Sequence, residues 1–466
     1  MATRDHDLTT GSIAGHFRLL AIPAAMGMLF TTLYNMVDVY FAGQISTDAQ
    51  AGLAVGFQAF FVLIAVGFGT GSAMSALVGN ARGKKDDETA RRLAMQGVSF
   101  SIAMTGLMLI IGALLGPRLI VLVSEPGAYR EAATGYFYWL LAAMPGFVIG
   151  FSSNGILQAH GDSVTQQRGM MVAFFANIVL NPLFIYGIPG LVPGLGFNGI
   201  ALATVVSQTG VMLWILYTIR GLRIMQDATM SDLLPDMTSY KEIFRQMIPT
   251  ASAMLVMFIS GFVVQYALKG FGGHAIAAYG IALRIEQVLL LPVLGMTGAL
   301  LPIAAQNFGA GAHDRVRDAL WFCWKLGALI TLFAAPLLWF GGGQTMALFT
   351  DDPAVIAVGI SYLRVDSVLF GVYMMLFSIN SLLQAFKRPV WTLWISVYRQ
   401  GFGVAFFVWL LIGVVGMDVW GVWLGIGLAV GTGWLLALVV VMRVARTEIG
   451  GLGGGRILAK KAGQGS

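Results

Sequence analysis

Long apolar runs separated by short polar connections occupy most of the chain. Such runs recur twelve times and lie near residues 17–42, 50–80, 93–116, 132–159, 166–187, 197–220, 243–270, 277–307, 317–340, 354–386, 391–413 and 418–444. A helix needs roughly 20 mostly apolar residues to cross a bilayer, and the runs lack the apolar–polar alternation of a membrane β-barrel. The pattern therefore predicts an all-α polytopic membrane protein with twelve transmembrane helices.

Composition agrees with this prediction and excludes several other classes of protein. The 466 residues are 57% hydrophobic and 11% charged, and their mean hydropathy is +0.79. Soluble domains carry roughly 25% charged residues, so neither a water-soluble globule nor a disordered chain fits. The single cysteine, Cys323, excludes a disulfide framework and a Cys-based metal site. We expect no metal and no cofactor.

The placement of lysine and arginine predicts the orientation of the chain. If the N-terminus is cytoplasmic, the outer connections hold only Arg118, Arg130 and Lys269, and most other cations lie inside. The positive-inside rule then places both termini in the cytoplasm and the protein in the inner (plasma) membrane as a multi-pass protein. Because the cations lie in connections rather than on one basic face, we expect no nucleic-acid partner.

The sequence contains an internal repeat with a nearly constant offset. The matched positions are Pro23 and Pro249, Asn80 and Asn307, Asp87 and Asp314, Pro126 and Pro353, Asn154 and Asn380, residues 157–159 and 383–385, and Gly199 and Gly425. Each copy holds six spans, an even number, so both copies start on the same side of the membrane. The two lobes are then related by a pseudo-twofold axis along the membrane normal.

The repeat predicts a domain organisation. We expect an N-terminal six-helix lobe at 1–220, a cytoplasmic linker at 221–241, a C-terminal six-helix lobe at 242–446 and a polar cytoplasmic tail at 447–466. Two similar bundles suit alternating access around a central cavity. Duplication also occurs in channels and membrane enzymes, which remain alternatives here.

The first span carries an acid, Asp38. Thr31, Tyr34, Asn35 and Asp38 follow helical spacing and share one face, which lipid cannot satisfy. A carboxyl group held inside the membrane can load and release a proton, or bind sodium in its charged form. The alternative is that Asp38 snorkels to the nearby outer surface, since the loop begins at Gly43.

The fifth and sixth spans supply polar partners for such an acid. Asn177 and Asn181 lie four residues apart on one face, and Pro182 follows directly, where a kink would free a backbone oxygen. The sixth span adds the polar residues Thr204, Ser207 and Gln208. The alternative is that these residues only hold helices together.

The second lobe has no acid at the position matching Asp38, where Val264 stands. Its charges inside predicted spans are Arg284, Glu286, Arg364, Asp366 and Arg399. The members of each close pair are two residues apart, so they do not face each other on one helix. Partners across helices would support a functional role; snorkelling arginines and structural ion pairs are the alternative.

Motifs of soluble enzymes are not evident. Residues 194–199 fit a dinucleotide-binding pattern, but they follow an outer loop rather than a strand, and no acid lies about 20 residues further on. Residues 79–85 resemble a phosphate-binding loop only in part, because no Ser or Thr follows the lysine. We therefore expect no enzymatic activity, and transport would draw on an ion gradient.

Together, several motifs resemble those of the multidrug and toxic compound extrusion (MATE) family. They are LYNMVD at 33–38, GFGTG at 67–71, LQAHGD at 157–162, NIVLNP at 177–182, RIE at 284–286 and QNFGAG at 306–311. The resemblance covers about residues 15–446. It is closest to the DinF-like bacterial branch, because the first-span acid is present and the seventh-span glutamate of the NorM-like branch is not evident.

This resemblance implies an antiporter that expels organic, often cationic, amphipathic compounds in exchange for protons or sodium. It implies a coupling role for Asp38 and a cation site at Asp38, Asn177, Asn181 and Thr204, supported by the polar face of Tyr34, Asn35 and Thr31. Glu286, Asp366 and Arg284 are candidate contributors from the second lobe. Relatives often have an aspartate where this chain has Asn181, and the lost carboxylate favours protons over sodium.

The expected partners are small organic substrates and membrane lipids, and we expect a monomer. One rival function is a lipid-linked precursor flippase, which would need a cavity rich in arginine to hold pyrophosphate. A second rival is a membrane-embedded transferase, which would need acids and histidines clustered at one membrane face. The five histidines are scattered along the chain, which disfavours the transferase.

Overall fold

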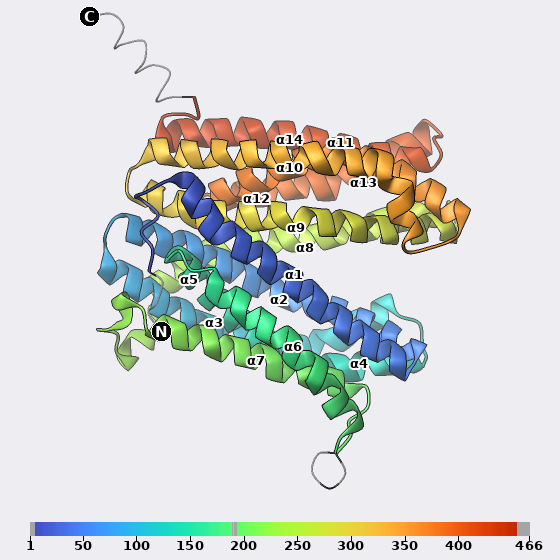
Figure 1. Ribbon diagram of the computed structural model, residues 1–466, viewed down its shortest axis with the longest axis horizontal. Coiled ribbons are helices and arrows are strands. Elements are labelled where there is room, and N and C mark those ends of the chain that lie inside the picture. Colours follow the sequence, from blue (N-terminus) through green and yellow to red (C-terminus); the bar gives the residue numbers. More distant parts are fainter. Residues whose placement is uncertain (1–4, 189, 191–192, 454–466) are drawn as a thin grey trace, which may run out of the picture. The chain divides into compact units, whose positions relative to one another are not determined.

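The computed structural model describes residues 5–188, 190 and 193–453, with the backbone only at Val123. The described chain is built of helices joined by short connections (Figure 1). The helices of the first half are α1 Ile13–Ile45, α2 Thr47–Gly83, α3 Asp87–Val123, α4 Ala128–Leu141, α5 Met144–Ala159, α6 Val164–Tyr186 and α7 Asn198–Arg220. Two short 3-10 helices follow, η1 Arg223–Met225 and η2 Met230–Leu233.

The second half repeats this layout. Its helices are α8 Met237–Lys269, α9 Gly273–Gly309, α10 His313–Ala347, α11 Pro353–Ala385, α12 Pro389–Ser396, η3 Val397–Gly403, α13 Val404–Trp409, η4 Leu410–Val414 and α14 Val419–Ile449. The segments η3 and η4 are π-helical, so the chain from α12 to η4 is one span with two widened stretches.

The described helices confirm the all-α membrane fold. Eleven of them are long and apolar enough to cross a bilayer, and α4 with α5 forms a twelfth span that is bent by 51°. The predicted fourth span at 132–159 is therefore two helices. Pro145 lies in the first turn of α5, where its missing N–H interrupts no helical hydrogen bond, so the chain can restart a helix there in a new direction.

Contacts divide the chain into two compact units. One unit contains Ile22–Ala251 with the segment up to Leu8, and the other contains Thr9–Ala21 with the chain from Ser252 onward. Two helices, α1 and α8, therefore begin in one unit and continue in the other. The two matched prolines of the repeat, Pro23 and Pro249, lie beside these two crossing points.

The two halves repeat their backbone conformation as well as their sequence. Positive φ angles occur at Lys85 and Gly311 and again at Gly161 and Lys387, which are matched positions of the repeat. Hydrogen bonds repeat too, because Asn80 donates to the Ala76 carbonyl and Asn307 donates to the Ile303 carbonyl, both at 2.8 Å. The repeat thus fixes the same helix ends in both halves.

Within the first unit, α2 and α5 cross with almost no space between their backbones. A Cβ atom at Gly155 would lie 2.0 Å from the Gly71 carbonyl oxygen, and one at Gly71 would lie 2.6 Å from the Phe151 carbonyl oxygen. Small residues allow this close approach of membrane helices. The glycines of the GFGTG motif at 67–71 therefore allow α2 to pack closely against α5.

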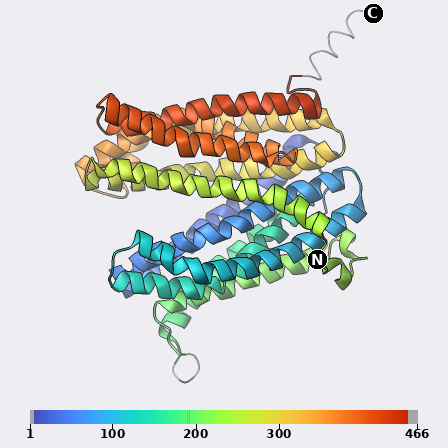
Figure 2. The same ribbon diagram turned by 180° about the vertical axis from the view of Figure 1, so that it is seen from behind.

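The predicted linker is ordered and docks on α3 within the first unit. The Gln96 side-chain amide donates to the carbonyls of Asp232 and Leu234, and Ser99 donates to the Leu233 carbonyl at 2.6 Å. In both views η1 and η2 lie at the end of the unit where α2 gives way to α3 (Figure 1 and Figure 2).

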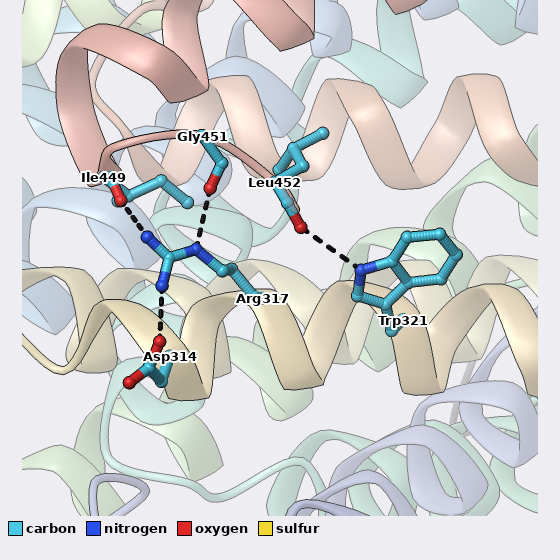
Figure 3. Close-up of polar contacts among 6 residues, drawn as sticks. All are labelled: Asp314, Arg317, Trp321, Ile449, Gly451 and Leu452. Carbon is cyan, nitrogen blue, oxygen red and sulfur yellow. Dashed lines mark hydrogen bonds and ion pairs between the residues drawn. The ribbon is translucent and has the colours of Figure 1, made fainter. Parts of the chain in front are cut away.

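At the end of the second unit, Arg317 of α10 holds the last turn of α14 (Figure 3). Its guanidinium donates to the carbonyls of Ile449 and Gly451 and pairs with Asp314. The last carbonyls of a helix lack internal partners, so this cation caps α14. Residues 454–466, which include most of the predicted tail, lie outside the described residues.

Candidate functional site

The Asp38 carboxylate lies inside the first unit and not at its surface. Its side chain on α1 is 5% exposed. The Asn181 amide of α6 donates to Asp38 Oδ1 at 2.9 Å, and the Thr204 hydroxyl of α7 donates to Asp38 Oδ2 at 3.3 Å. Three helices thus converge on one carboxyl group.

Two further side chains extend this network. The Asn181 amide also donates to Asn177 Oδ1 at 2.6 Å, and the Tyr34 hydroxyl donates to Thr204 Oγ1 at 3.1 Å. Both asparagines are fully buried. We call the set Asp38, Tyr34, Asn177, Asn181 and Thr204 the carboxylate cluster; every hydrogen bond found at Asp38 itself is donated to it.

The packing of α6 against α7 positions the partners of Asp38. A Cβ atom at Gly199 would lie 2.5 Å from the Phe184 carbonyl carbon, so the start of α7 lies directly against the end of α6. Four-residue spacing then sets Asn177 and Asn181 on one face. The helix α6 continues through Pro182 to Tyr186, so the expected kink does not divide it.

Thr31 and Asn35 do not join the cluster. Both side chains are exposed, and the Thr31 hydroxyl donates to the Gly27 carbonyl of its own helix at 2.9 Å. At about 100° per residue, the four polar residues of this face span an arc of about 100°. The half that holds Tyr34 and Asp38 is buried, and the half that holds Thr31 and Asn35 is not.

Several polar atoms around the cluster have no hydrogen-bond partner among the described residues. They are Asn177 Nδ2, Asn181 Oδ1 and Ser207 Oγ, all buried. Unsatisfied buried groups are costly and call for an explanation. Here they are spare donors and acceptors on the helices that supply the partners of Asp38.

No lysine, arginine or histidine forms an ion pair with Asp38 in the described part of the chain. An ionised carboxylate away from water is unfavourable unless another charge compensates it. The cluster therefore offers one buried acid that a proton or a small cation can neutralise.

The second unit holds a different set of buried charges. The Tyr362 hydroxyl donates to Glu286 Oε2 at 2.7 Å. Asp366 is 1% exposed and Arg399 is also buried, and neither Asp366 oxygen nor Arg399 Nε has a hydrogen-bond partner among the described residues. The Arg399 stem lies against Gly433, where a Cβ atom would approach Arg399 Cβ to 2.8 Å.

Arg284 and Arg364 do not belong to this buried set. Both are exposed, whereas Glu286 and Asp366, two residues along the same helices, are buried. Two-residue spacing places side chains on different sides of a helix, which explains the separation. The sequence identifies all five charged residues inside the predicted spans of the second lobe, but it does not indicate which of them are buried.

A duplicated bundle of twelve helical spans with buried acids suits a membrane transporter, and solved structures of transporters share this fold. A MOP superfamily transporter from Pyrococcus furiosus matches with a TM-score of 0.87 and 24% identity, over 96% of this chain and 98% of that one. A MATE transporter in its bent conformation matches with a TM-score of 0.85 and 25% identity, over 95% and 98%.

The match to a family model assigns the chain to one family of transporters. The MatE family model matches residues 23–186 and again 249–409, and the chain belongs to this family. The two matches begin at Pro23 and Pro249, the first matched pair of the internal repeat.

Relatives of known name are distant but cover most of the chain. An FAD transporter from Shewanella oneidensis is 25% identical over 397 residues, which are 84% of this chain and 87% of the relative. A probable multidrug resistance protein, YoeA of Bacillus subtilis, is 25% identical over 419 residues, 87% of this chain and 89% of the relative. Similarity thus extends through both lobes.

Proposed function

We propose that this protein is a secondary antiporter that exports organic compounds, often cationic and amphipathic, in exchange for protons. The observation that carries the proposal is Asp38, a buried carboxylate held by donors from two other helices and paired with no cation among the described residues. Family membership supports export of drugs and other foreign compounds, since several relatives are named as multidrug resistance or export proteins.

The hydrogen bonds around Asp38 favour a proton over sodium as the coupling ion. Sodium would need several oxygen ligands turned toward it, as hard cations do, but the N–H group of Asn181 and the O–H group of Thr204 point at the carboxylate. A proton needs only one carboxyl oxygen and the rotation of one donor. An amide at position 181 also lacks the second negative charge that would attract a metal ion.

Protonation of Asp38 would change the network in a defined way. A neutral carboxyl group keeps one acceptor fewer and gains a donor, so either Asn181 or Thr204 must turn, and the unpartnered Asn181 Oδ1 can accept the new proton's hydrogen bond. If two conformations of the transporter stabilise the neutral and ionised forms differently, a proton gradient favours one over the other. A cationic substrate would compete for the same charge.

The proposal also covers topology, location and assembly. Both termini are cytoplasmic, the protein lies in the plasma membrane and acts as a monomer without enzymatic activity. Glu286 and Asp366 form a second buried acidic centre that contributes to ion or substrate binding from the second lobe. The flippase is not favoured, because among the described residues only one buried arginine, Arg399, accompanies these acids. The transferase is not favoured, because the five histidines are scattered along the chain.

Efflux from cells tests this function. Cells that express the wild type should expel ethidium, and Asp38→Asn should abolish expulsion while its membrane level is unchanged. Asp48→Asn, an exposed acid in the first turn of α2, is the matched control and should remain active. Full efflux by Asp38→Asn would reject the assigned role. In proteoliposomes, uptake driven by a sodium gradient alone would overturn the preference for protons.

A further inference from the structure

An open groove lies along α10 and α11, away from the carboxylate cluster. Its volume is about 490 Å³, and both helices qualify as membrane spans. Its lining residues are Trp339, Phe340, Gly343, Gln344, Ala347, Ile356, Ile360 and Arg364. The groove is thus apolar apart from one amide and one guanidinium.

The guanidinium of Arg364 forms no ion pair with any described residue. It lies 6.0 Å from the centre of the Trp339 ring. The residues outside the described ranges contain no Asp or Glu. Since an unpaired cation within a span is costly, the exposed guanidinium is a candidate to take its counter-charge from another molecule.

The depth of Arg364 suits a lipid headgroup. The helix α11 has 33 residues, which makes it about 50 Å long at 1.5 Å per residue. If it is centred on a hydrocarbon layer about 30 Å thick, it extends about 10 Å beyond each side. Arg364 follows Pro353 by eleven residues, so it lies about 6 Å inside the hydrocarbon boundary. A long arginine side chain reaches a headgroup phosphate from that depth.

We propose that this groove is a binding site for an anionic phospholipid of the surrounding membrane. The Arg364 guanidinium forms a bidentate contact with the phosphodiester, as its planar fork of donors allows, and the Gln344 amide donates a further hydrogen bond. The acyl chain lies along Phe340 and Ile360. An anionic lipid is preferred to a zwitterionic one because a headgroup ammonium would meet the guanidinium and be repelled.

The exposed aromatic rings support this assignment. Trp339 is 43% exposed, and tryptophan is enriched at the headgroup level of membrane proteins. Phe340 is 79% exposed and offers an apolar ring to the acyl chain. Gly343 forms part of the groove floor, since a Cβ atom there would lie 3.4 Å from Ile360 Cδ1. A larger side chain at this position would fill the groove without touching the charge of Arg364.

The test measures lipid retained by the purified full-length protein in detergent, by native mass spectrometry, with added phosphatidylglycerol or phosphatidylcholine. The wild type should retain phosphatidylglycerol preferentially. Arg364→Gln should weaken retention about tenfold, the value of one charge-assisted hydrogen-bonded contact. Gly343→Leu should do the same with the charge intact, and Arg364→Lys should retain part of the binding. Arg118→Gln, an exposed arginine of α3, is the matched control and should bind as the wild type.

Three results would overturn the proposal. Equal retention of the two lipids by the wild type would mean that only a non-selective lipid shell is present. Unchanged retention by Arg364→Gln would place the lipid elsewhere. Displacement of the bound lipid by inorganic phosphate at equal concentration would show that the site binds a free anion and not a lipid. A folded Arg364→Lys that binds while Arg364→Gln does not would support the proposal even if Gly343→Leu fails to fold.

Discussion

Replacing Thr204 by valine isolates one hydrogen bond to the Asp38 carboxylate. Valine keeps the shape of threonine but has no hydroxyl, so Asp38 Oδ2 loses its donor and the Tyr34 hydroxyl loses its acceptor. The ionised form of Asp38 suffers most, because hydrogen bonds to charged groups are stronger than those between neutral groups. The variant should therefore hold its proton to a higher pH than the wild type.

The size of this effect follows from the length of the bond. Hydrogen bonds to charged groups contribute roughly 1.5–3 kcal/mol, and the 3.3 Å separation between Thr204 Oγ1 and Asp38 Oδ2 argues for the lower end. Since about 1.4 kcal/mol corresponds to one pH unit, the pH at which transport is half-maximal should rise by about one unit.

Proteoliposomes offer the assay. Substrate efflux would be recorded over a series of internal pH values for the wild type, Thr204→Val and Thr204→Ser, with equal amounts of inserted protein. The serine variant keeps the hydroxyl and should follow the wild type. A valine variant with an unshifted midpoint, or a serine variant shifted as far as valine, would refute the reasoning that the Thr204 hydroxyl stabilises an ionised Asp38.

Two further predictions concern stability. His160 lies outside the spans, and its burial, together with the charge of Arg82, lowers its pKa from 6.5 to about 3. Below pH 6.5 the unfolded chain therefore binds a proton that the folded chain does not. The free energy of unfolding falls as the pH drops through this range. Between pH 7 and 5 the loss should be about 2 kcal/mol, and His160→Gln should remove it in thermal unfolding in detergent; an unchanged pH slope would contradict this. Gly155→Ala should lower the free energy of unfolding by about 1–3 kcal/mol, because its Cβ would lie 2.0 Å from the Gly71 carbonyl oxygen. The control Gly261→Ala has open space around the new Cβ and should melt at the temperature of the wild type. Equal melting temperatures of the two variants would disprove the close crossing of α2 and α5.

The fold was largely predictable from periodicity and repetition. Apolar run lengths set the number of spans, and the repeat set the two lobes, because both are properties of the linear sequence. The break between α4 and α5 was not predicted, since a run such as 132–159 is apolar on both sides of the bend. Pro145 is a signal for it, but a proline inside a long apolar run does not by itself tell a bend from a continuous helix such as α6, which contains Pro182.

The candidate site was predictable in its chemistry but not in its geometry. Helical spacing grouped Tyr34 with Asp38 and Asn177 with Asn181, because such neighbours follow from 3.6 residues per turn. Which half of the first-span face is buried depends on how α1 packs against α6 and α7, and no local pattern records that. The sequence names Ser207 beside Thr204 as a polar residue of the sixth span, but that its hydroxyl is buried without a partner depends on the same tertiary packing.

The most direct test of coupling at Asp38 is a titration of substrate release against pH with purified protein, wild type beside Asp38→Asn. A fluorescent organic cation would be bound at high pH and the fraction released would be followed as the solution is acidified. Competition between proton and substrate predicts a single release transition in the wild type, accompanied by uptake of protons from the medium, and no transition in the variant. The same release curve in both proteins would contradict a coupling role for Asp38.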